Sequence, residues 1–189
     1  GLEAYGTELS ETVVKIASTR IKCSHVTSLE LPFLEKHFDL VVAKDVFPMI
    51  RDKNHWFFEI ARVLKTGGYF ISYLPEIMDF YEKPLYNYIA GSFNASVQAY
   101  EDIEKVISML KLNGFEVEKK RLLLGTVEMN FDYANKHRCG FFNNTNIQSL
   151  DKEREDGINK FISGLQSLAE IGIRPHYEWV RTVIVGKKI

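Results

Sequence analysis

Short apolar runs that suit β-strands alternate along this chain with segments whose apolar residues recur at helical spacing. The clearest strand is FDLVVA at 38–43, because a nearly continuous apolar run of this length is typical of a parallel strand covered on both faces. In the first part of the chain, the expected elements are a strand at 2–7, a helix at 11–20, a strand at 21–28, the strand at 38–43, a helix at 54–64 and a strand at 69–74. Strands that alternate with helices predict an α/β fold with a mostly parallel sheet, right-handed crossovers and helices on both faces.

Residues at the element boundaries carry the signals expected of helix ends. Ser10 precedes the first helix and suits an N-cap, because its hydroxyl can accept a hydrogen bond from the first turn. Gly67-Gly68 supplies a left-handed exit that we expect to end the helix at 54–64. Asn113-Gly114 is expected to stop a later helix.

The alternation breaks at 75–100, where aromatic side chains gather without a clean period. Regular order then returns as a helix within 101–114, a strand at 115–129, a polar loop at 130–150, a helix at 154–172 and a final strand at 177–188. We predict a single domain over residues 1–189, in which 76–100 and 130–172 are insertions or lid elements. The stretch 76–100 suits a lid over a substrate as well as a packed excursion or a dimer contact.

The composition of the chain argues against several classes of protein. The chain has 189 residues and a formal net charge of −1, so it lacks the electrostatic footprint of a protein that binds nucleic acid or an anionic membrane. Its two cysteines, Cys23 and Cys139, cannot build a disulfide framework and fit a reducing compartment, so we expect a cytoplasmic protein. The scattered histidines give no metal-ligand spacing, and no apolar run approaches the ~20 residues of a membrane span. The oligomeric state stays open.

A charged pair, Lys44-Asp45, follows the apolar strand at 38–43. In open α/β sheets the carboxyl ends of strands are where ligands bind. Asp45 could orient a substrate group, or act as a general base if desolvation raises its pKa. Lys44 could hold a substrate anion, or the two side chains could simply pair with each other.

Six segments in sequence order resemble the class I S-adenosylmethionine-dependent methyltransferases, in their small-molecule branch. They are YGTELSE at 5–11, TSLELPF at 27–33, FDLVVAKDVFPMI at 38–50, EIARVLKTGGYFISYLPE at 59–76, EDIEKVISMLKLNGFEVEK at 101–119 and WVRTVIVGKK at 179–188. The resemblance implies a Rossmann-like sheet with an antiparallel last strand. It also implies an enzyme that transfers a methyl group from S-adenosylmethionine to an oxygen, nitrogen or carbon of a small molecule.

The resemblance also implies where the cofactor and the substrate bind. Glu8 matches the acidic residue that accepts hydrogen bonds from the ribose hydroxyls, with Leu9 beside it. Thr27 and Ser28 match the segment that meets the adenine, although an ordinary turn would explain them equally well. The segment with Lys44 and Asp45 passes close to the transferring methyl and the amino-acid end of the cofactor. The expected substrate residues are Tyr73, Tyr81 and Tyr86.

One part of the family pattern has no counterpart here. The family's first strand, with its glycine-rich cofactor loop, does not occur in the sequence, and Pro48-Met49 stands where a histidine pair is common. A sheet without that central strand would expose strand edges on both sides of a gap. We therefore expect a further N-terminal piece of roughly 40–60 residues, the length of a strand–loop–helix unit with a short leader. Two alternatives stay open: a non-catalytic partner or regulatory domain, and a dinucleotide or nucleotide-sugar enzyme that uses Glu8 on a ribose.

Overall fold

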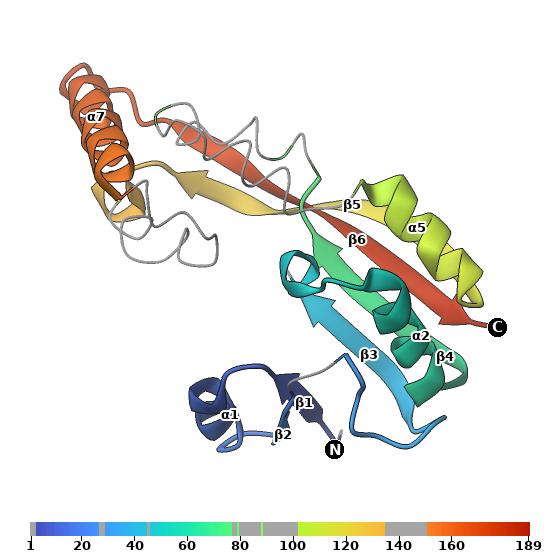
Figure 1. The fold of residues 1–189 in the computed structure, drawn as a ribbon. Coiled ribbons are helices and arrows are strands. Elements are labelled where there is room, and N and C mark those ends of the chain that lie inside the picture. Colours follow the sequence, from blue (N-terminus) through green and yellow to red (C-terminus); the bar gives the residue numbers. More distant parts are fainter. Residues whose placement is uncertain are drawn as a thin grey trace. The chain divides into compact units, whose positions relative to one another are not determined.

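The computed structural model describes residues 3–26, 29–44, 46–76, 79, 88, 102–134 and 151–189. These residues form two compact units that share the strands β4, β5 and β6, and each unit is described by itself (Figure 1). Unit 1 comprises 1–72, 104–119 and 184–189, and unit 2 comprises 73–103 and 120–183. The expectation of a single domain stays a prediction.

Unit 1 contains a small parallel sheet made of the first two strands. β1 (Tyr5–Glu8) leads through α1 (Glu11–Ala17) into β2 (Lys22–His25), and the register places Tyr5 opposite Lys22 and Glu8 opposite His25. Ser10 caps α1 as expected, because its hydroxyl oxygen accepts a hydrogen bond from the Val13 amide.

The second sheet has the strand order β3-β4-β6-β5. Its strands are β3 (Phe38–Lys44), β4 (Leu64–Leu74), β5 (Phe115–Glu128) and β6 (His176–Lys188). β6 runs opposite to β4 and β5 (Figure 1), so the last strand is antiparallel, as the family resemblance implied. The predicted α/β class is therefore confirmed.

The core of unit 1 forms where α2 (Lys53–Val63) packs on β4. The ring of Phe70 lies 5.9 Å from that of Trp56 and 6.1 Å from that of Phe57, both in edge-on contact. Phe57 and Ile60 are fully buried, as the helical spacing of the sequence predicted. On α5 (Ile103–Leu112), Val106 and Leu110 are also buried, and Gly114 ends the helix, as predicted, with a φ of 80°.

α2 ends one residue from its predicted end at 64, but Gly67-Gly68 does not provide the stop. Gly67 has the expected positive φ of 79°, but α2 already ends at Val63, and Leu64 is extended. Lys188 from β6 takes over the capping role, since its Nζ donates hydrogen bonds to the carbonyl oxygens of Ala61 and Leu64 at 2.6 and 2.7 Å. A cation is favourable at this end of a helix, although burial lowers the pKa of Lys188.

Apolar surface on one side of unit 1 is less covered than the sequence predicted. Leu40 and Val42, on one face of β3, are 49% and 56% exposed, whereas Ala43 on the other face is buried. Helix α1 buries none of its residues, and its apolar side chains Val13 and Ile16 are exposed. Only one face of β3 is therefore covered by the described residues.

Unit 2 has its own apolar cluster, formed by α7 (Asp151–Glu170) and the chain around Met129. The buried members are Met129, Tyr133, Ala134, Ile158, Phe161, Ile162 and Leu165. A helix was predicted at 154–172, and its place in the sequence is confirmed. The loop expected at 130–150 instead begins with a helical turn at 131–134, where the Asn130 side chain accepts a hydrogen bond from the Tyr133 amide. Most of the expected lid at 76–100 lies outside the described residues.

Replacing Gly114 by alanine should destabilise the protein through the backbone alone. No atom lies within 4 Å of the position a Cβ would take, but the φ of 80° is costly for an L-residue. We expect the free energy of unfolding in a denaturant titration to fall by about 1–2 kcal/mol. Gly125→Ala is the matched control, because that site is equally open and lacks a positive φ. Equal effects of the two substitutions would contradict the left-handed backbone conformation assigned to Gly114.

Candidate functional site

The predicted ribose contact, Glu8, is the last residue of β1. Its Oε1 accepts hydrogen bonds from the backbone amides of Leu9 and Ser10, at 2.8 and 3.1 Å, which fixes the carboxylate at the entrance to α1. Among the described residues, none donates a hydrogen bond to Oε2 of Glu8. This oxygen can therefore accept a hydrogen bond from a ligand hydroxyl, and the carboxylate fits a ribose diol through one oxygen rather than two.

His25 lies directly across from Glu8 in the β1–β2 register and was not predicted as a site residue. Its Nε2 lies 3.0 Å from the carbonyl oxygen of Leu9. A carbonyl oxygen only accepts, so Nε2 carries the proton and donates it. His25 thus holds the turn after Glu8 in place. The only sequence signal for this role was its place at the end of an alternating strand.

Lys44 is the last residue of β3 and has an exposed side chain. The other predicted cofactor residues, Asp45, Thr27 and Ser28, lie outside the described residues. The structure therefore brings together Glu8 and Leu9 of the predicted set, and adds His25 to them. The roles assigned to the remaining residues stay predictions.

The segment Leu31–Phe33, which follows the predicted adenine contact, is held by an ion pair on α2. Glu59 Oε2 accepts a hydrogen bond from the Leu31 amide at 2.8 Å. Arg62 donates to the carbonyl oxygens of Phe33 and Leu31 at 2.8 and 2.9 Å. The two side chains also bind each other, with Arg62 Nε 2.6 Å from Glu59 Oε1. We call these two residues the α2 clamp.

The electrostatics of the α2 clamp follow from this pairing. The hydrogen bond from Arg62 lowers the pKa of Glu59 below its ordinary value, although burial acts in the opposite direction. The same bond raises the pKa of Arg62. Both groups are therefore charged at neutral pH, and the clamp anchors Leu31–Phe33 to α2, whose apolar face is buried in the core of unit 1. The sequence motif EIARVL contained both residues but gave no sign of their partners about 30 positions earlier.

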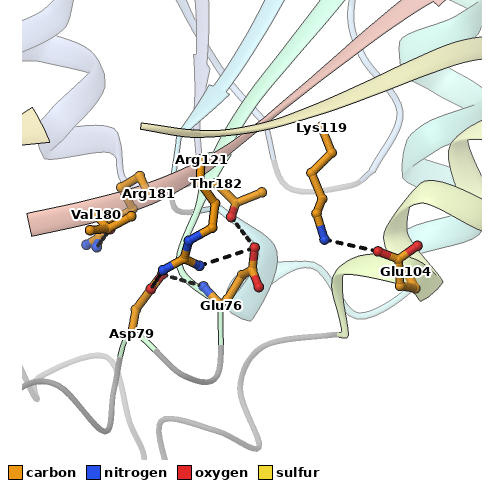
Figure 2. A network of polar contacts seen from close by, with 8 residues as sticks. All are labelled: Glu76, Asp79, Glu104, Lys119, Arg121, Val180, Arg181 and Thr182. Atoms are coloured by element: carbon orange, nitrogen blue, oxygen red, sulfur yellow. Dashed lines mark hydrogen bonds and ion pairs between the residues drawn. The ribbon is translucent and has the colours of Figure 1, made fainter. Parts of the chain in front are cut away.

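In unit 2, a polar network surrounds Glu76, just beyond the end of β4 (Figure 2). Arg121 on β5 donates a 2.7 Å hydrogen bond to Asp79 and forms a 3.3 Å ion pair with Glu76. Thr182 on β6 donates a short hydrogen bond to the Glu76 carboxylate, and the Glu76 amide donates to Asp79 at 2.7 Å. Burial opposes the charge on Arg121, but its bonds to both carboxylates outweigh this and raise its pKa. Glu76 therefore helps to join β4, β5 and β6.

The predicted substrate residues are only partly described. Tyr73 is half-buried near the end of β4 and belongs to unit 2. Tyr81 and Tyr86 lie outside the described residues. Within the described ranges, no group of three His, Cys, Asp or Glu side chains could hold a metal ion. None of the helices that the structure describes is long and apolar enough to cross a membrane.

Comparisons with known proteins agree with this fold. Residues 1–72 match the family model described as a methyltransferase domain. The YcgJ protein of Bacillus subtilis has the same fold, with a TM-score of 0.63 and 16% identity over 98% of this chain and 82% of its own. The resemblance to class I S-adenosylmethionine-dependent methyltransferases is therefore confirmed, and the Rossmann-like fold with it.

Two further relatives give the comparison more detail. Demethylmenaquinone methyltransferase of Thermotoga maritima is 27% identical over 139 residues, which are 61% of this chain and 61% of that protein. The match thus spans less than two thirds of the relative's length. A proposed methyltransferase from an antibiotic biosynthesis pathway of Anabaena variabilis superposes with a TM-score of 0.73, at 15% identity over 98% of this chain and 81% of that one.

Glu59→Gln should weaken the α2 clamp and change the response to acid. A carboxylate whose pKa is lowered in the folded state stabilises the protein above its unfolded pKa of about 4.3, and this contribution is lost as the pH falls through the folded pKa. At pH 7 we expect the substitution to lower the free energy of unfolding by about 1.5–3 kcal/mol. The difference from the wild type should stay constant down to the unfolded pKa of about 4.3 and shrink below it, as the pH falls through the lowered folded pKa of Glu59.

Glu104→Gln is the control for this prediction. Glu104 pairs with Lys119 at 3.1 Å, but its side chain is 72% exposed, so its loss should change stability by less than about 1 kcal/mol. Urea titrations at several pH values measure both variants. If Glu59→Gln were as mild as the control, the anchoring role of the α2 clamp would be refuted.

Proposed function

We propose that this chain is part of an enzyme that transfers a methyl group from S-adenosylmethionine to a small organic molecule. The observation that carries the proposal is the carboxylate of Glu8. It stands at the carboxyl end of a strand, is oriented by two backbone amides, and keeps one oxygen for a ligand. It also lies within the segment that matches the methyltransferase family model.

In this proposal the chain acts mainly by positioning the cofactor and the acceptor relative to each other. Glu8 Oε2 would accept a hydrogen bond from the ribose of the cofactor, and His25 keeps the Leu9 turn in the required place. The α2 clamp holds Leu31–Phe33, and we propose that Thr27 and Ser28, which precede this segment in the sequence, meet the adenine. S-adenosylmethionine supplies an electrophilic methyl group when bound. Such a transfer is accelerated chiefly by aligning the nucleophile with the methyl.

The acceptor is proposed only by class. The net charge of −1 disfavours a nucleic acid, which leaves a small molecule as the better substrate. One relative is named for its action on demethylmenaquinone, but it shares only 27% identity over part of its length. Within this proposal Tyr73, Tyr81 and Tyr86 line the acceptor, and Asp45, next to Lys44, would orient the acceptor or take its proton if a base is needed.

A non-catalytic, methyltransferase-like partner domain is the second candidate. The observation that favours it is that β1 and β3 belong to separate sheets in the part of the chain that the structure describes, so these residues place strand ends on only part of the perimeter of the proposed cofactor site. Thermal-shift measurements with the natural polypeptide separate the candidates. A rise in Tm with S-adenosylhomocysteine supports the enzyme, and an unchanged Tm with this ligand supports the partner domain. Stabilisation by NAD alone would point to a dinucleotide enzyme.

Glu8→Gln should weaken S-adenosylhomocysteine binding without disturbing the fold. The amide oxygen can still accept from Leu9 and Ser10, but the charged acceptor for the ribose is lost. Isothermal titration should show binding weaker by about 1.5–3 kcal/mol. Glu11→Gln, in the first turn of α1, is the control and should leave the affinity unchanged. An unaltered Kd for Glu8→Gln would refute the ribose contact.

A further inference from the structure

β5 is the last strand of the second sheet, and three consecutive leucines are exposed in its middle. Among the described residues, β6 is the only strand beside β5, so the other edge of β5 is an edge of the sheet. Leu122, Leu123 and Leu124 are 41%, 59% and 44% exposed, although leucine is ordinarily a residue of the interior. Such an edge presents a row of backbone N–H and C=O groups with which a strand of another chain can pair.

The side chains of β5 alternate between two faces of the strand. Burial has the same phase at both ends of β5, where Phe115, Val117, Gly125 and Val127 are more buried than the residues next to them. The even-numbered residues therefore share one exposed face. From 120 onward they are Lys120, Leu122, Leu124, Thr126 and Glu128. This face has a cation at one end, a carboxylate at the other and two leucines between them.

This order of charges suits antiparallel pairing of β5 with the β5 of a second copy. Contacts in a two-fold symmetric pair are reciprocal, and directly opposed residues of antiparallel strands lie on the same face of the sheet. With Leu124 on the two-fold axis, Lys120 of each copy lies opposite Glu128 of the other. Opposite charges therefore meet at both ends of the paired segment.

Neighbouring registers lack this match. With the axis at residue 122, Glu116 would lie opposite Glu128 of the second copy, and with the axis at residue 123, Glu118 would lie opposite it. Like charges directly opposite each other are unfavourable. An axis at Gly125 would place Glu128 opposite an apolar residue, Leu122, of the second copy. Charge complementarity thus favours the axis at Leu124.

The other face of β5 fits the same register. Leu123 then lies opposite Gly125 of the second copy. No atom lies within 4 Å of the position that a Cβ of Gly125 would take, so the glycine leaves room for the leucine side chain. The most exposed leucine of the three therefore lies opposite the residue with the smallest side chain of the strand.

We propose that two copies of this chain associate through the edge of β5, in antiparallel register about a two-fold axis at Leu124. Backbone hydrogen bonds join the two segments 120–128, and the Lys120–Glu128 pairs fix their register. The sheet then continues from one copy into the other, so neither β5 remains an edge. All the residues of the paired segment belong to unit 2, whereas Glu8 and the α2 clamp belong to unit 1. The inference would therefore hold if the proposed methyl transfer were wrong.

Two cysteine substitutions test the register. Leu124→Cys places a thiol opposite its own copy, where the Cβ atoms are about 4.5–5.5 Å apart, close enough for a disulfide after a small adjustment. Leu122→Cys is the matched control, because Leu122 is almost equally exposed, but its two copies would lie about 13 Å apart along the strands. Under mild oxidation we expect a covalent dimer on a non-reducing gel from Leu124→Cys alone. The unsubstituted protein, with its Cys23 and Cys139, gives the background. Equal crosslinking of the two variants, or none, would overturn the proposed register.

Charge reversal tests the association itself. Sedimentation velocity over a range of concentrations should show a dimer of the unsubstituted protein. Lys120→Glu should raise the Kd of this dimer roughly tenfold or more, since like charges would meet twice, and adding Glu128→Lys should return the Kd to near its original value. Leu112→Lys is the control and should leave the Kd unchanged, because Leu112 is 85% exposed at the end of α5. A monomer at every concentration, or a double variant no tighter than Lys120→Glu, would refute the proposal.

Discussion

The packing of α2 against β4 is the interaction on which the rest of unit 1 depends. Phe57 and Phe70 are fully buried between these elements, where each large apolar side chain contributes roughly 1.5–3 kcal/mol. That packing fixes the face of α2 from which Glu59 and Arg62 reach Leu31–Phe33. It also places the end of α2 within reach of a lysine from the last strand. One apolar contact thus sets the position of a polar clamp, a helix cap and a segment of the proposed cofactor site.

The second constraint is the strand pairing of β1 and β3, which belong to separate sheets among the described residues. Backbone groups along β1 and β3 need partners, and the described chain supplies them along one edge of each strand only. The carboxyl ends of the same strands carry the polar residues proposed to hold the cofactor, among them Glu8 and Lys44. The open edges of β1 and β3 among the described residues and the position of the proposed site are therefore consequences of the same topology, since ligands of open α/β sheets bind where strands end.

Much of the fold could be predicted from short-range patterns. Ser10 was expected to cap α1 and Gly114 to end α5, and both are confirmed because these signals act within a few residues. The predicted stop of α2 was wrong: the helix ends at Val63, close to its predicted end, but the glycine pair lies beyond it, within β4. Likewise, the apolar run of β3 predicted that both faces of the strand would be buried. The burial of a face depends on elements that lie elsewhere in the chain, and only one face is buried by the described residues.

In the candidate site, too, the local features could be predicted from the sequence and the long-range contacts could not. The sequence by itself determined that an acidic residue, Glu8, stands where a strand passes into a helix, because both signals are local. Only the tertiary structure decided that His25 holds the following turn and that Glu59 and Arg62 grip a segment about 30 residues away. It also decided which edges of β1 and β3 have no neighbouring strand among the described residues. The physical reason is that strand pairing and long-range hydrogen bonds join residues whose separation along the chain leaves no periodic trace in the sequence.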